Sequence, residues 1–209
     1  MSYSFWAYDQ YAGSTPYYSH YQIGTSTEDD ASLAIIDLNH GNPYVYTAIE
    51  SGSSTANVQS ASRSVGWHHF EFEFNQITTT TSILFDGNVI QSSSYSRDPG
   101  FFRLVLHDHI GGPQETVIDD FEYRVDGNLI YQQGFESSTL DSNWVVTRQD
   151  LGTYLSSGDT SLSHSGAAGL ALGSTTYSNV AAIITFVPEP SSMALFGLSS
   201  LVLVLRRKR

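Results

Sequence analysis

Two carboxylates at alternate positions are the strongest candidates for catalysis in this sequence. Glu71 and Glu73 lie in the segment 67–74, where side chains two positions apart share a face if the chain is extended. Glycoside hydrolases need two carboxylates about 5 to 10 Å apart, and this pair can meet that spacing. A solvated strand face rich in Glu is the commoner cause of such a pattern. We therefore predict no enzymatic activity and keep a glycoside hydrolase or lyase as the alternative.

Two other clusters have the chemistry of metal ligands. His107 and His109 place two imidazoles on one strand face, but no third ligand for a transition metal can be identified. Asp119 and Asp120 form a carboxylate pair that suits a hard cation, so calcium is the candidate cofactor. The alternative is that these two residues cap turns and meet solvent.

Aromatic residues are abundant, with 13 Tyr and three Trp. Aromatic rings suit sugar recognition because their faces stack on the C–H faces of pyranoses, and Tyr44 and Tyr46 are the candidate glycan contacts. Such Tyr-rich segments are as often half-buried strand residues. Trp6, Trp67 and Trp144 are expected in the core.

The charge of the chain excludes some partners. Four of the nine basic residues and one of the 21 acidic residues lie in residues 188–209, which leaves five Arg against 20 carboxylates in residues 1–187. A body charge of about −15 argues against binding to nucleic acid or anionic membranes. The chain has no cysteine, so disulfides and thiolate metal sites are excluded.

The sequence pattern predicts that short strands position these residues. In residues 67–74, His68, Phe70, Phe72 and Phe74 share one face, a clear period of two. Asp-Gly-Asn at 86–88 and again at 126–128 predicts two tight hairpins. Further strands are expected at 5–8, 34–38, 44–49, 101–106 and 117–125. Many short strands with polar turns predict an all-β, two-sheet antiparallel sandwich.

Four motifs carry a resemblance to a known fold family. They are FWAYDQ at 5–10, GWHHFEFEF at 66–74, ILFDGNVI at 83–90 and VIDDFEY at 117–123. Together they resemble the concanavalin A-like, laminin G-type jelly-roll domains over residues 3–130. The resemblance implies a jelly-roll sandwich and says little about activity. The segment lacks the Glu-x-Asp-x-x-Glu pattern of the laminarinase-like enzymes.

A second segment resembles the opening half of the same domain type. It comprises the Phe-Glu at 135–136, Trp144 and the His-Ser-Gly turn at 164–166. In the family this half comes first, so the order here is unexpected. The chain is either a fragment that spans parts of two sandwiches or a circular permutant whose pieces close on each other. The permutant predicts that residues 180–186 lie beside residues 3–9 in one sheet.

The last 22 residues combine a turn, an apolar run and a basic cluster. Residues 193–205 are 13 uncharged residues, which would form a helix of about 20 Å. A stable membrane anchor needs around 20 apolar residues, so this short transmembrane helix predicts a processed or transient anchor. The turn before it is Pro188, Glu189 and Pro190, and the cations that would hold its end in the cytoplasm are Arg206, Arg207, Lys208 and Arg209.

This tail resembles the PEP-CTERM sorting signal of Gram-negative bacteria. The resemblance implies export, recognition by an exosortase, which is a membrane peptidase, and cleavage near the Pro-Glu-Pro turn. An ordinary anchor or a buried helix are the alternatives. Residues 1–9 have neither the basic nor the apolar region of a signal peptide, so we expect an upstream start or a gene fragment.

The sequence thus predicts three regions: a concanavalin A-like sandwich (1–130), a β-rich segment that would complete it (131–187) and a sorting signal (188–209). The expected function is that of an exported protein, anchored briefly in the inner membrane and then placed at the cell surface or in the extracellular matrix. There it would bind or structure polysaccharide.

Overall fold

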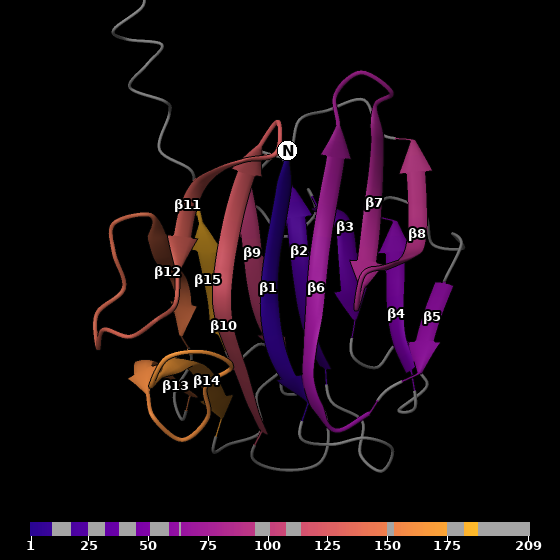
Figure 1. Cartoon of the computed structure of the whole chain (residues 1–209). Coiled ribbons are helices and arrows are strands. Elements are labelled where there is room, and N and C mark those ends of the chain that lie inside the picture. Colours follow the sequence, from indigo (N-terminus) through magenta and orange to yellow (C-terminus); the bar gives the residue numbers. More distant parts are fainter. Residues whose placement is uncertain are drawn as a thin grey trace, which may run out of the picture.

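Two antiparallel sheets pack face to face in the computed structural model of the chain (Figure 1). The structure describes residues 1–9, 18–24, 32–37, 45–50, 59–62, 64–94, 101–107, 114–149, 153–174 and 182–187. The all-β antiparallel sandwich predicted from the sequence is confirmed, whereas the finer assignment to a jelly roll of the concanavalin A type stays a prediction.

The front sheet has the strand order β13-β14-β10-β1-β6-β7-β8, and β11 also pairs with β10. Its strands are β1 (Ser2–Asp9), β6 (Gly66–Asn75), β7 (Thr80–Phe85), β8 (Asn88–Ser94), β10 (Gln114–Val125), β11 (Asn128–Gln133), β13 (Thr153–Asp159) and β14 (Gly169–Ser174). The face of this sheet that points away from the second sheet is called the outer face below.

The back sheet has the order β12-β15-β9-β2-β3-β4-β5. Its strands are β2 (Tyr18–Gly24), β3 (Ser32–Asp37), β4 (Val45–Glu50), β5 (Gln59–Ser62), β9 (Phe101–His107), β12 (Trp144–Gln149) and β15 (Ala182–Phe186). Every strand predicted from the sequence is present in one of the two sheets.

Phenylalanine rings fill the space between the sheets. Phe5 of β1 lies 5.6 Å from Phe70 of the same sheet and 5.1 Å from Phe102 of the opposite sheet, measured between ring centroids. Phe121 and Phe186 are 4.8 Å apart in the same way, and Phe5, Phe102, Phe121 and Phe186 are all fully buried. Burial of each such ring contributes roughly 1.5–3 kcal/mol, and antiparallel pairing holds β1 between β6 and β10.

Local sequence rules explain the strands that carry the outer face. In β6 the predicted alternation is confirmed. Phe70 and Phe72 are buried, while Glu73 is exposed on the opposite face of the strand. Both predicted hairpins are confirmed as well. Asp86 and Gly87 have φ values of 47° and 76°, and 126–127 repeat them at 51° and 77°, which is the pattern of a type I′ turn.

The strands of residues 131–187 extend both sheets. β14 pairs with β10 in the front sheet, and β15 pairs with β9 in the back sheet. The expectation that residues 180–186 lie beside residues 3–9 is wrong, because β6 and β10 occupy both edges of β1. The two segments meet across the core instead, where Tyr3 and Phe186 have ring centroids 6.3 Å apart.

Residues 188–209, including the predicted membrane helix at 193–205, lie outside the described residues. Within the part of the chain that the structure describes, no helix has the length and apolar character needed to cross a membrane.

Candidate functional site

Aromatic side chains gather on the outer face, towards the end of the sheet where β1 finishes and β6 begins. Tyr8 of β1 stands opposite Trp67 of β6, and Trp6 stands opposite His69. Their ring centroids are 5.4 Å and 5.1 Å apart, respectively. All four side chains are half-buried. With His164, described next, they form what we call the aromatic platform.

His164 reaches the platform from the turn between β13 and β14, residues 160–168. Its imidazole stacks on the indole of Trp6 with ring centroids 3.9 Å apart and an interplanar angle of 11°. It also meets Trp67 edge to face at 5.5 Å. One surface therefore combines rings from β1, from β6 and from a turn whose His164 lies 97 residues after Trp67 and 158 residues after Trp6.

A β-bulge in β10 directs two carboxylates at this turn. The pairing with β1 shifts by one residue between Ser4 and Trp6, and Asp120 has a φ of 49°. The extra residue places Asp119 on the outer side of β10 while Phe121, only two positions on, still enters the core. Without the bulge, the period of two would place Asp119 and Phe121 on the same face.

Asp119 is completely buried and holds the backbone of the turn. Its Oδ2 accepts hydrogen bonds from the amides of His164 (2.9 Å) and Ser165 (3.1 Å), and its Oδ1 accepts one from the amide of Asp120 (2.8 Å). Burial raises the pKa of Asp119, and these three N–H donors oppose that shift. The carboxylate thus replaces solvent for amides that would otherwise be unpaired.

Asp120 and Glu136 complete the support of the turn. Asp120 accepts hydrogen bonds from Nδ1 of His164 (2.8 Å) and from the hydroxyl of Ser165 (2.6 Å). The carboxylate of Glu136 accepts from the amide of Ala167. Gly166 allows this contact, because a Cβ at that position would collide with Oε1 of Glu136.

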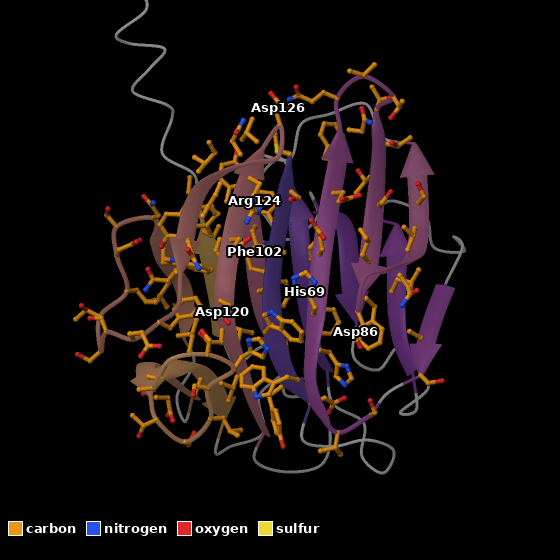
Figure 2. The ribbon with its side chains drawn as sticks, viewed as in Figure 1. His69, Asp86, Phe102, Asp120, Arg124 and Asp126 are labelled. Carbon is orange, nitrogen blue, oxygen red and sulfur yellow. The ribbon has the colours of Figure 1, made fainter. Side chains whose placement is uncertain are left out.

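A pocket of about 530 Å³ opens beside the platform. Trp6, Trp67 and His69 line it together with the Asp86–Gly87 turn of the β7–β8 hairpin. Figure 2 shows His69 and Asp86 on the side of this face away from Asp120. The pocket is an open depression, and its walls combine indole rings with a carboxylate.

Ser64, His68 and Asp86 are connected in the manner of a serine-hydrolase triad. Asp86 Oδ2 lies 2.9 Å from His68 Nδ1, and the Ser64 hydroxyl lies 3.1 Å from His68 Nε2. The same Nε2 is closer to the carbonyl oxygen of Ser64, at 2.8 Å. A carbonyl only accepts, so Nε2 donates to it and is not available to take the hydroxyl proton. The arrangement fixes the end of β6 and does not activate a nucleophile.

Glu71 and Glu73 line a second pocket, of about 490 Å³, near the other end of the outer face. Burial and the charge of Glu71 raise the pKa of Glu73. A cleft that binds and cleaves a sugar would need aromatic walls on which the sugar stacks. Among the described residues that line this pocket, the one aromatic side chain is Phe74, and it is buried in the core.

The other predicted ligand sites have mixed outcomes. The carboxylate oxygens of Asp119 and Asp120 accept hydrogen bonds from the 160–168 turn, and calcium binding there stays a prediction. No group of three His, Asp or Glu side chains with the geometry of a metal site occurs in the described ranges. His109 and Tyr44 lie outside the described residues, and Tyr46 is placed by its backbone in β4 of the back sheet, opposite Ala61.

The platform residues were missed in the sequence. The core assignment is right for Trp144, which is 5% exposed, but wrong for Trp6 and Trp67. A signal was present for Trp67, because the alternation of β6 already placed it on the face of Glu71 and Glu73. No pattern in the sequence pointed to His164 as a neighbour of Trp6.

Comparison with known proteins identifies the C-terminal segment. Residues 186–209 match the PEP-CTERM protein-sorting motif, a range that contains all the residues predicted to form the sorting signal. The motif indicates an exported protein that an exosortase, a membrane protein, recognises and sorts. No curated protein matches the chain.

Proposed function

We propose that this exosortase-sorted protein is a non-enzymatic carbohydrate-binding module that the sorting step delivers to the cell surface or extracellular matrix. The observation that supports the proposal is the aromatic platform. Indole and phenol rings have apolar faces and polar edges, and here several of them meet at the surface of one sheet. Carboxylates and a hydroxyl border these rings, which is the mixture of stacking faces and hydrogen-bonding groups that a sugar needs.

Structural needs alone do not account for this surface. The core is already filled by phenylalanines, and the outer face could have been covered by small polar residues, as it is at Ser2, Ser4 and Ser82. Instead, Trp6 and Trp67 are partly exposed beside this open pocket. Convergence of aromatic and polar groups at a pocket is the usual mark of a binding site.

Substitution of a platform tryptophan tests this proposal. Trp67→Ala removes a ring that lines the pocket, and loss of a central aromatic contact generally weakens binding by about 1–2 kcal/mol, or roughly tenfold. We expect retention on a panel of insoluble polysaccharides to fall accordingly. Ile130→Ala is the matched control, because Ile130 is 59% exposed on β11 and lies outside the platform. Equal retention of both variants and the unmodified chain would refute the proposal.

A glycoside hydrolase or lyase is the second candidate, favoured by one observation. Glu73 sits in a pocket with a raised pKa, which is a property of general acids. Release of reducing ends or of unsaturated sugars from the bound polysaccharide, lost in Glu73→Gln, would establish this alternative. Binding without product, equal in the unmodified chain and in Glu73→Gln, would establish the non-enzymatic module.

A further inference from the structure

The groups that border the platform are almost all acidic. Asp86 lies on one side and Asp120 on the other (Figure 2). Glu71 is the next outward residue of β6 after His69, and Glu136 lies under the 160–168 turn. A ligand that packs against Trp67 in the pocket therefore meets the carboxylate of Asp86, which lines the same pocket.

No Arg or Lys that could offset this charge borders the platform in the described part of the chain, although Asp86 and Asp120 each pair with an imidazole, that of His68 at 2.9 Å and that of His164 at 2.8 Å. Arg103 is buried, with 1% of its surface exposed. Arg124 is paired with Glu122 at 2.7 Å and lies towards the opposite end of the outer face. Residues 1–187 contain no lysine. Recognition of carboxylate or sulfate groups normally uses Arg or Lys, and none of the described residues that border the platform is either of these.

We propose that the aromatic platform selects neutral or amino-bearing glycans and rejects polysaccharides that carry uronate or sulfate groups. This inference rests on the proposed carbohydrate-binding function and adds the charge class of the ligand. The imidazoles of His68 and His164 are already bonded to Asp86 and Asp120, so a uronate on the platform would approach these carboxylates or Glu71 with no described Arg or Lys to compensate its charge. A neutral hydroxymethyl group at the same position meets no such repulsion, and an ammonium group is attracted to these carboxylates and to the indole faces.

The inference predicts a specific response to salt. The Debye length is about 10 Å at 0.1 M ionic strength and about 3 Å at 1 M. Rejection of anionic glycans should therefore weaken as salt is added, whereas stacking of neutral glycans should hardly change. Binding through an undetected cationic site would show the opposite trend, with anionic glycans lost first.

The test compares each neutral polysaccharide with the same polymer oxidised at C6 to the uronate, and includes N,N,N-trimethyl chitosan, whose ammonium groups keep their charge at the pH of the assay, as the amino-bearing polymer. Affinities for the full chain are measured at pH 7.5 in 0.05 M and 0.5 M NaCl. We expect at least about tenfold weaker binding of the oxidised polymer at low salt, and a smaller gap at high salt. Equal or tighter binding of the oxidised polymer overturns the inference but leaves the carbohydrate-binding function in place. Failure to bind any of the three classes overturns both.

A pair of variants shows whether the outer-face charge is responsible. Glu71→Gln removes the carboxylate next to the platform and should narrow the gap between neutral and oxidised polymers about two- to threefold. Asp126→Asn removes the same charge from the β10–β11 turn, which borders the second pocket together with Glu71 but lies farther from the platform, and Asn also tolerates the positive φ of 51° there. An equal effect of both substitutions would overturn the assignment to the platform.

Discussion

Replacement of Asp119 by Asn tests how the 160–168 turn is held against the sheet. Asn has the shape of Asp but only one accepting oxygen, whereas Asp119 accepts from the amides of Asp120, His164 and Ser165 through two oxygens. In either orientation of the amide, its NH₂ group faces at least one N–H donor. One buried amide is therefore left without an acceptor.

The size of the effect follows from these bonds. An unpaired buried donor costs about 1–3 kcal/mol, and a hydrogen bond to a neutral acceptor contributes about 1 kcal/mol less than one to a charged acceptor. Burial of the charge opposes this, as the raised pKa of Asp119 shows, and Asn avoids that penalty. We expect a net loss of about 2–4 kcal/mol, which lowers Tm by roughly 5–15 °C in a chain of this size.

Urea denaturation of the purified chain measures this loss. Asp120→Asn is the control, because Asp120 accepts hydrogen bonds only from side chains of the turn. An Asn at position 120 also tolerates the φ of 49° found there. It should cost less than about 1 kcal/mol. In Asp119→Asn, faster hydrogen exchange is expected at the amides of His164 and Ser165. A loss below about 0.5 kcal/mol, or a larger loss in the control, would refute the reasoning.

Two further substitutions test the surroundings of this turn and of the core. Burial and Asp141 raise the pKa of Tyr131, so the folded state favours its neutral form; the stabilisation is present below about pH 10 and is lost as pH rises above it. The stability advantage of the unmodified chain over Tyr131→Phe should therefore shrink above pH 10 in urea titrations, and a constant advantage would contradict this. Gly166→Ala should destabilise by at least about 1 kcal/mol more than Gly127→Ala, because both have positive φ but only the Cβ at 166 meets Glu136. Equal Tm values would contradict this steric account.

Much of the fold could be predicted because its signals are local. The alternation of β6 and the two Asp-Gly turns depend on neighbouring residues, and each reads directly from the sequence. The outward direction of Trp67 follows from the same alternation. It was missed because large aromatic residues are usually assigned to a core without regard to the face on which they fall.

The rest of the site depends on long-range pairing. The bulge at Asp120 changes which side of β10 each residue faces, and a bulge adds one residue without a distinct sequence mark. His164 meets Trp6 only because β14 pairs with β10, and the paired residues of these strands are 52 to 60 positions apart in the sequence. The place of β15 in the back sheet likewise depends on its pairing with β9, whose partner residues are 76 to 84 positions away in the sequence.

The three tryptophans allow a direct test of the carbohydrate-binding platform. Each indole gives one N–H signal in a two-dimensional NMR spectrum of the ¹⁵N-labelled chain, and single Trp→Phe variants assign them. Trp144 is an internal control, because its Nε1–H donates to the Tyr131 hydroxyl at 3.0 Å in the core. A saturating neutral oligosaccharide should shift the signals of Trp6 and Trp67 and leave that of Trp144 unchanged. Binding of the oligosaccharide without a shift at Trp6 or Trp67 would contradict the account.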